Sequence, residues 1–315
     1  MPSSPARIVV VGSANTDLVV RVRSLPRPGE TVIGGTFASV GGGKGANQAV
    51  AAARAGGHTT FIAKLGADAM GDAAVAAFAA DGIDTTFITR DPVTPSGVAF
   101  ILVDDRGENS IAVASGANDR LTPADVDRAS AAIRAADILL VQLEIPLETV
   151  RHAVAMAHAA GVPVILNPAP ARPLDAGLLA QVAILTPNET EAELLTGLAV
   201  TEESSAAAAA GRLLAMGPRS AVITLGCQGA LVAEAAATAH VAGYEVTPVD
   251  TVAAGDVFNG CLAVAIAEGK NLVEAARFAN AAAAIAVTRH GAQASAPRRD
   301  EIFALQSTLE PTDSP

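Results

Sequence analysis

Short apolar runs, each about as long as one β-strand, alternate with alanine-rich segments along most of this chain. The runs contain almost no polar residues, which is typical of strands covered by helices on both faces, as in a mostly parallel sheet. We therefore predict a three-layer α/β/α fold. The predicted strands are residues 8–12, 61–65, 138–143, 164–167, 184–186 and 221–225, and the predicted helices include residues 47–54, 147–159 and 202–215.

Two stretches interrupt this alternation, at residues 18–37 and 97–115. The second contains two β-prone runs around a polar turn, which predicts a hairpin. Neither stretch has a helix that would cover it, so we predict a small β-sheet that stands off the main body. A weaker hairpin pattern spans residues 230–242. The 315 residues are then expected to form a single domain.

Charge and composition argue against several classes of protein. The net charge of −11 opposes nucleic acid or an anionic membrane surface as the main partner. Cys227, Cys261 and the five histidines match no metal-binding or redox spacing, so we expect reduced thiols and no zinc site. Charged residues interrupt the alanine-rich stretches before about 18 apolar residues accumulate, and no signal peptide is evident. We expect no membrane span and a cytoplasmic location.

The segment from Asp250 to Asp256 joins two carboxylates and several small residues to the start of an apolar helix. A helix start leaves backbone N–H groups without partners, and Ala254 and Gly255 would let a bulky anion approach them closely. Asp256 falls in the first turn, where a carboxylate is favoured even without a function. The second acid and the small residues favour a different interpretation, an anion site with a base beside it.

One reaction that an anion site with a base would suit is the transfer of a phosphoryl group to an alcohol, which needs an acceptor for the hydroxyl proton, donors around the phosphoryl group and a magnesium ion. We predict that Asp256 is the base. The N–H groups of Ala254, Gly255 and Asp256 would then form an anion hole that stabilises charge on the phosphoryl oxygens.

Three further motifs precede this segment: Asn15-Thr16-Asp17, residues 42–49 and residues 186–191. On these four motifs, in this order, the chain resembles the ribokinases, members of the PfkB carbohydrate kinase family, from about Arg7 to about Arg298. The resemblance implies a ribokinase-like fold and ATP-dependent phosphorylation of D-ribose at O5. It also implies that the small sheet is a lid over the sugar and pairs two subunits into a homodimer.

The implied sugar site lies at the carboxyl edge of the sheet, where ligands usually bind in open α/β folds. Asn15 and Asp17 follow the first strand, and Asp17 would accept two sugar hydroxyls. From the residues alone, both could simply form a turn. The other implied sugar contacts are Gly42, Gly43, Lys44, Asn47, Glu144 and Asp256.

The implied nucleotide site uses Asn188 for the phosphates, and Glu191 would order water around magnesium. An Asn and a Glu three residues apart at a helix start can also cap that helix. The other implied contacts are Thr224, Gly226, Gly229, Gly255 and Asn280, the last near the adenine.

A potassium ion is implied beside the anion hole, where an oxygen shell would suit a hard cation. The implied ligands are the Asp250 carboxylate, the Ser295 side chain and the backbone carbonyls of Val252, Ala286, Arg289 and Gly291. Without the resemblance, residues 286–295 read as an ordinary loop.

Other functions stay open at this point. Gly41, Gly43 and Ala46 fit a relaxed dinucleotide fingerprint with Asp68 at a suitable distance, which would suit an NAD-dependent oxidoreductase. Against this, residues 31–40 make a poor buried strand. A sugar-binding protein without activity, or a kinase of 2-deoxyribose, fructose or another sugar, are further alternatives.

Overall fold

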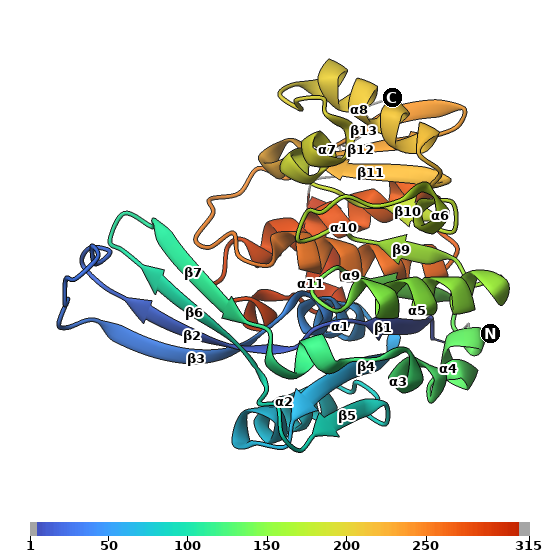
Figure 1. The fold of residues 1–315 in the computed structure, drawn as a ribbon. Helices are drawn as coiled ribbons and strands as arrows, with labels where there is room; N and C mark the ends of the chain where they lie inside the picture. The colour runs from blue at the N-terminus through green and yellow to red at the C-terminus, as the bar shows by residue number, and fades with distance from the viewer. Residues whose placement is uncertain (1–4, 309–315) are drawn as a thin grey trace.

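The computed structural model describes residues 5–308, and in Figure 1 a central sheet lies between two layers of helices. The sheet has nine strands in the order β13-β12-β11-β10-β9-β8-β1-β4-β5. All pairs from β11 to β5 are parallel, and the two pairs from β11 to β13 are antiparallel. The strands are β1 (Arg7–Val11), β4 (His58–Gly66), β5 (Ile88–Asp91), β8 (Ile138–Val141), β9 (Val164–Leu166), β10 (Ile184–Leu185), β11 (Ser220–Thr224), β12 (Gly229–Glu234) and β13 (Ala237–Ala242).

Each central strand contributes side chains to two separate hydrophobic cores. In β1, Ile8 and Val10 pack into one core, whereas Val9 and Val11 pack into the other. Successive side chains of a strand point to opposite faces, so both faces of the sheet are buried. The three-layer prediction is confirmed.

One helical layer contains α1 (Lys44–Arg54), α2 (Ala69–Ala80), α9 (Ala254–Ala267), α10 (Leu272–Ala286) and α11 (Arg299–Thr308). The other contains α3 (Pro123–Asp127), α4 (Ser130–Ala135), α5 (Leu147–Ala159), α6 (Ala176–Leu179), α7 (Glu189–Thr196) and α8 (Glu203–Ala215). Three short 3-10 helices are η1 (Gly116–Arg120), η2 (Gly226–Gln228) and η3 (Gln293–Ser295). Within residues 5–308, no helix is both long and apolar enough to span a membrane.

The second sheet has four strands in the order β3-β2-β6-β7 and projects from the central body (Figure 1). Its strands are β2 (Asn15–Arg21), β3 (Thr36–Gly42), β6 (Gly97–Val103) and β7 (Asn109–Ala114). The hairpin predicted within residues 97–115 is formed by β6 and β7. The small sheet extends beyond the predicted lid segment at about residues 18–37, because β2 begins at Asn15 and pairs with β3 as far as Gly42.

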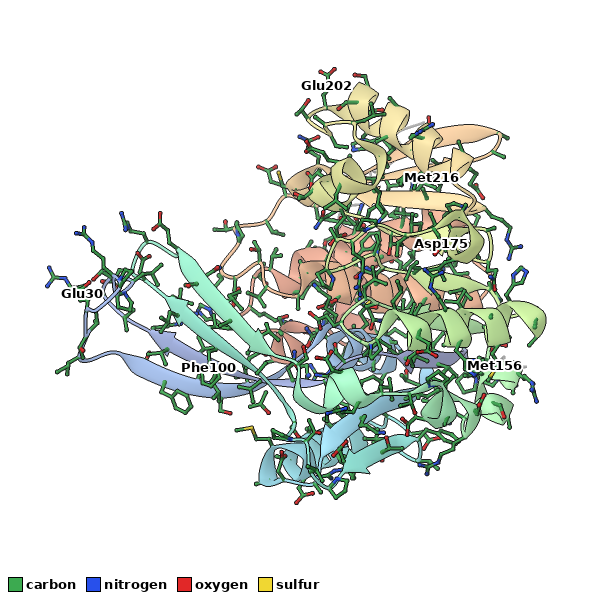
Figure 2. The ribbon with its side chains drawn as sticks, viewed as in Figure 1. Glu30, Phe100, Met156, Asp175, Glu202 and Met216 are labelled. Carbon is green, nitrogen blue, oxygen red and sulfur yellow. The ribbon has the colours of Figure 1, made fainter. Side chains whose placement is uncertain are left out.

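The small sheet has two different faces. Asp17 pairs in register with Ala99, which in turn pairs with Val113, so these side chains share one face. Phe37 and Phe100 belong to the opposite face and are 65% and 56% exposed; Figure 2 shows Phe100 projecting from the sheet. This second face is therefore an exposed apolar surface.

Candidate active site

Asp256 lies in the first turn of α9, where the start of α1 meets it. The Asp256 carboxylate is 6% exposed and accepts one hydrogen bond on each oxygen. Asn47 Nδ2 donates to Oδ2 and Gln48 Nε2 donates to Oδ1, both at 2.9 Å. The predicted base is thus held in one orientation by two amides of α1.

The turn before α9 leaves backbone donors exposed. Ala253 has a φ of 60°, the only non-glycine residue of the described chain in the left-handed region, and no side chain caps the helix. Within residues 5–308, the N–H groups of Gly255 and Asp256 have no acceptor, whereas the N–H of Ala254 makes a long 3.4 Å bond to Thr251 O. Two of the three donors predicted for the anion hole are therefore free.

Glycines let the residues predicted to bind the sugar approach one another closely. Gly42 lies opposite Asn15 in the ladder, and a Cβ atom on Gly42 would lie 2.1 Å from Asp17 Oδ2. Gly43 has a φ of 86°, and a Cβ there would lie 2.7 Å from the Asn15 backbone nitrogen. Side chains at either position would displace Asn15 and Asp17, which the family resemblance assigns to the sugar.

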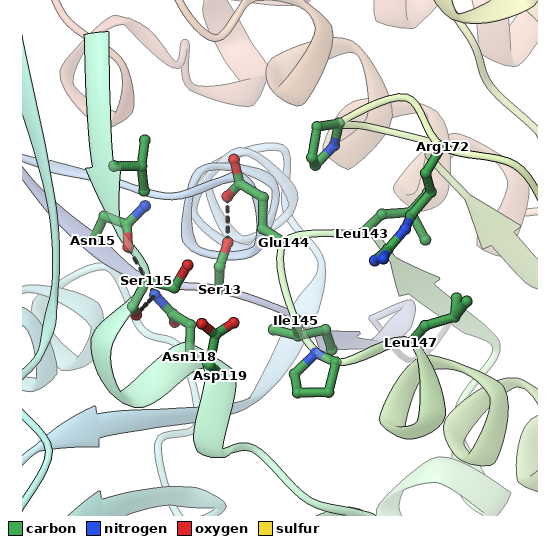
Figure 3. A pocket seen from close by; sticks show the side chains of 13 residues that line it. Ser13, Asn15, Ser115, Asn118, Asp119, Leu143, Glu144, Ile145, Leu147 and Arg172 are labelled. Carbon is green, nitrogen blue, oxygen red and sulfur yellow. Dashed lines mark hydrogen bonds between the residues drawn. The ribbon is translucent and has the colours of Figure 1, made fainter. Parts of the chain in front are cut away.

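Glu144 follows β8 and joins the loops that contain Ser13 and Lys44. Its Oε2 accepts hydrogen bonds from Ser13 Oγ at 2.6 Å and from the Lys44 backbone nitrogen at 3.0 Å. A cavity of about 530 Å³ opens beside this group (Figure 3). Its lining includes Asn15, held by the Asn118 amide at 2.7 Å.

Ser13 and Asn118 were missed in the sequence. Ser13 directly follows Gly12, the last residue of the first predicted strand, and a short polar residue at that position was the available signal. Asn118 lies in η1 and is 2% exposed; it also accepts from the Ala14 backbone nitrogen. Because its hydrogen-bond partners Ala14 and Asn15 are distant in sequence, no local sequence pattern could indicate the role of Asn118.

The acidic groups around this site influence one another. Burial raises the pKa of Asp17 to about 6, with further contributions from the negative charges of Glu144 and Asp256. Burial also raises the pKa of Asp256, although Lys44 and the amides of Asn47 and Gln48 oppose that effect. Burial alone would lower the pKa of Lys44, but attraction to Asp256, Glu144 and Glu191 outweighs it and raises that pKa. A positive ammonium therefore faces the acids at neutral pH.

A second cavity, of about 820 Å³, is lined in part by Ala254 and Gly255 at the start of α9. It brings together all the residues predicted to contact the nucleotide: Asn188, Thr224, Gly226, Gly229, Gly255 and Asn280. Cys227, Tyr244 and Phe258 also line it and were not predicted. The Asn280 amide nitrogen donates to the carbonyls of Val241 and Ala242, so it holds β13 in place.

Asn188 and Glu191 form a capping box at the start of α7. Asn188 Oδ1 accepts from the Glu191 nitrogen at 2.8 Å, and a Glu191 carboxylate oxygen accepts from the Asn188 nitrogen at 2.9 Å. Capping is thus the geometry that these side chains adopt. Among residues 5–308 the Asn188 amide nitrogen has no acceptor, so it can still donate into the second cavity.

The segments predicted to hold a monovalent cation are joined through Asp250. Its carboxylate accepts from the nitrogens of Val252 and Gly291, each at 3.0 Å. Ser295 is buried, and its hydroxyl donates to Ala292 O. The Ala286 carbonyl accepts from the Arg289 nitrogen, and the Arg289 guanidinium pairs with Glu301. A carboxylate with neutral oxygens nearby fits a hard monovalent cation.

Within the described chain, no group of three or more His, Cys, Asp or Glu side chains could hold a metal ion.

The dinucleotide fingerprint at residues 41–46 is not realised in the structure. It requires a buried strand before the glycines, but β3 is largely exposed and belongs to the small sheet. Asp68, the acid expected to bind a ribose, instead caps α2 and accepts from Gly71 and Ser96. The structure therefore contradicts the alternative of an NAD-dependent oxidoreductase.

Comparisons with known proteins agree with this geometry. Residues 5–299 match the model of the pfkB family of carbohydrate kinases. A ribokinase of Haemophilus influenzae is 47% identical over 93% of this chain and 96% of its own length. A deoxyribokinase of Salmonella typhi is 39% identical over 92% of this chain and 95% of its own. The structure of Arabidopsis thaliana ribokinase complexed with ribose and ATP aligns with a TM-score of 0.89 at 34% identity, covering 96% of this chain and 99% of that one.

Proposed function

The chain belongs to the pfkB family of carbohydrate kinases, and from this membership we infer that it transfers the terminal phosphoryl group of ATP to O5 of D-ribose. The products are D-ribose 5-phosphate and ADP. One observation carries the inference: Asp256 is hydrogen-bonded to Asn47, a predicted sugar contact, while Gly255 in the same helical turn has a free N–H group and lines the second cavity.

In this mechanism the Asp256 carboxylate accepts the O5 proton while O5 bonds to the γ-phosphorus and the bond from that phosphorus to the bridging oxygen of ADP breaks. The N–H groups of Gly255 and Asp256 stabilise the charge on the transferring group. Magnesium, when bound, would neutralise phosphate charge, and Glu191 would hold it through water. The sugar is oriented by Asp17, Asn15 and Glu144.

Measurement of ADP release over a panel of sugars tests the proposal. We expect ribose to give the highest kcat/KM, with 2-deoxyribose below it and fructose lower still. Preference for 2-deoxyribose would assign the chain to the activity of its Salmonella relative. Absence of sugar-dependent ADP release in the folded protein would contradict the proposal as a whole.

A substitution at Gly255 tests the proposed anion hole for the phosphates of ATP. A Cβ atom on Gly255 would meet nothing within 4 Å, and its φ is not in the left-handed region, so the protein itself does not require glycine there. We expect Gly255→Ala to leave the free energy of unfolding unchanged or raise it by up to about 1 kcal/mol. Its methyl group would occupy the approach to the N–H donors, so kcat/KM for ATP should fall at least about tenfold.

Gly211 in α8 is the matched control, because a Cβ there also meets nothing within 4 Å and no ligand is proposed nearby. Gly211→Ala should change stability in the same direction and leave kinetics unaltered. Equal kinetics of the two variants would contradict the assignment of the anion hole.

Potassium activation is part of the proposal. Because Asp250 joins the two predicted cation loops, Asp250→Ala should abolish the difference in kcat between potassium and sodium buffers. Activity of the variant in potassium should drop to the level of the native protein in sodium. A potassium response that survives in Asp250→Ala would remove Asp250 from the cation site.

We also propose a homodimer formed through the small sheet. Phe37 and Phe100 leave an apolar face in water, which commonly marks an interaction surface. Light scattering should give the mass of two chains; a mass near 31.4 kDa, that of one chain, would contradict this. A cytoplasmic location completes the proposal.

A further inference from the structure

A chain of buried amide side chains is hydrogen-bonded to Asp256, and none of its members lines either cavity. Gln48 Nε2 donates to Asp256 Oδ1 at 2.9 Å and to Asn167 Oδ1 at 3.1 Å, and Gln48 Oε1 accepts from Gln142 Nε2. We propose that Gln48 is a positioning residue, which fixes the Asp256 carboxylate for proton transfer through this amide chain. The proposal rests on the proposed function and adds a residue to its machinery.

The amide chain is anchored on the central sheet. Gln142, Asn167 and Thr186 each follow the last residue of a strand, and those strands, β8, β9 and β10, are neighbours in the sheet. Asn167 Nδ2 donates to the Thr186 carbonyl at 2.9 Å. Strands paired on both sides move little, so the positions of these amides are set by the most rigid part of the fold.

The same layer also reaches the anion hole. Thr186 Oγ1 donates to Asn259 Oδ1 at 2.6 Å, and Asn259 Nδ2 donates to the Gly255 carbonyl at 2.8 Å. The Asp256 carboxylate and the anion hole are therefore both connected by hydrogen bonds to residues at the ends of the same neighbouring strands. This arrangement can hold the proton acceptor and the phosphoryl site at a constant separation.

Gln48 has no freedom to adopt another orientation. It is fully buried, both of its N–H groups face acceptors, and its oxygen faces the Gln142 amide. A reversed amide would aim its oxygen at the Asp256 carboxylate and leave two acceptors unpaired, which is costly in a buried site. Gln142 is equally buried, and a Cβ atom on Gly12 would lie 2.2 Å from its Oε1.

Asn47 and Gln48 both bind Asp256, but they differ in whether they can also contact the sugar. Asn47 binds the other Asp256 oxygen, but its own Oδ1 is buried without a partner in the described chain, so it can accept a sugar hydroxyl. Gln48 has no polar atom left for a substrate, because its oxygen and both of its N–H groups already have partners. Loss of Gln48 should therefore change the chemical step and spare substrate binding.

Loss of the Gln48 donor should also change when Asp256 ionises. The charged groups that act on Asp256 are Lys44 from α1, Glu144 after β8, Glu191 from α7 and Asp17 from β2. The Gln48 hydrogen bond favours the ionised carboxylate, so its removal raises the pKa of Asp256. The acid limb of the kcat profile must then move to higher pH.

The test compares Gln48→Met with the native enzyme at saturating sugar and ATP. Met keeps the length of the side chain and removes the donor. We expect kcat to fall by about 10- to 100-fold, whereas KM for both substrates should stay within about twofold of the native values. The acid limb of the pH profile of kcat should move to higher pH.

Thr149→Val is the matched control, because Thr149 is also buried, lines neither cavity and would lose one hydrogen bond, to Leu121 O, that does not involve Asp256. It should lower stability and leave the pH profile unchanged. A folded Gln48→Met enzyme with the native pH profile, or with native kcat, would overturn the proposal.

If Gln48→Met does not fold, the same measurements can be made on Gln142→Met, because this substitution removes the amide donor that holds Gln48. An unchanged pH profile in folded Gln142→Met would then overturn the proposal. Failure of the proposed function is seen separately, because the native protein itself would show no sugar-dependent ADP release.

Discussion

Replacement of Asp256 by Asn is expected to lower kcat by about a thousandfold, because a positioned base contributes about two to four powers of ten. Asn has the same size but cannot accept the hydroxyl proton. The KM values for sugar and ATP should change little, since Asn47, Lys44 and the N–H groups of the turn remain. Steady-state ADP release at saturating substrates measures the effect.

The Asp256→Asn protein should remain folded and be at least as stable as the native one near neutral pH. Burial raises the pKa of the Asp256 carboxyl, so the ionised form opposes folding and a neutral amide removes that cost. Urea unfolding provides this control. A well-folded variant whose kcat is within tenfold of the native value would exclude Asp256 as the base.

Asp17→Asn should have opposite effects on binding and on stability. In the proposed complex Asp17 accepts two sugar hydroxyls, and hydrogen bonds to a charged group contribute about 1.5–3 kcal/mol each. Loss of the charge should therefore lower kcat/KM for the sugar by at least about a hundredfold, mainly through KM. ATP binding, measured without sugar, should be unaffected.

The stability effect follows from the pKa of Asp17. Its pKa is about 6 in the folded protein and about 4 when unfolded, so the folded state binds the proton more readily. The ionised carboxylate therefore opposes folding above pH 6, and this penalty disappears as the pH falls from 6 towards 4. Asp17→Asn should raise the free energy of unfolding by about 2 kcal/mol at pH 7.5 and by much less at pH 4.5.

Asp104 provides the matched control in the same small sheet. Its carboxylate accepts from the nitrogens of Arg106 and Glu108 in the β6–β7 turn. Asp104→Asn should lower stability without changing sugar kinetics. If Asp17→Asn were destabilising at pH 7.5, or if it left sugar KM unchanged, the account of the Asp17 site would be contradicted.

The sequence predicted the central sheet well for a physical reason. Strands buried on both faces contain uninterrupted apolar residues, and the runs at residues 8–12 and 138–143 both became central strands. The helix predicted at residues 147–159 matches α5 because a glycine and a proline lie close to its two ends. The six residues predicted from the resemblance to contact the nucleotide line one cavity at the start of α9.

Features that depend on distant partners could not be predicted. The start of β2 at Asn15 is set by pairing with β3 and β6, which no local pattern reveals. Gln48 and Gln142 did carry a signal, since each is a polar residue within an otherwise apolar segment. Such residues need hydrogen-bond partners when buried, but the sequence could not say that those partners include Asp256.

A crystal structure with ribose, magnesium and a non-hydrolysable ATP analogue would test the central claim most directly. The account predicts ribose O5 within hydrogen-bond distance of the Asp256 carboxylate, with the terminal phosphate on the N–H groups of Gly255 and Asp256. It would be contradicted if a different hydroxyl, or no part of the sugar, faced Asp256 while the phosphate lay away from that turn.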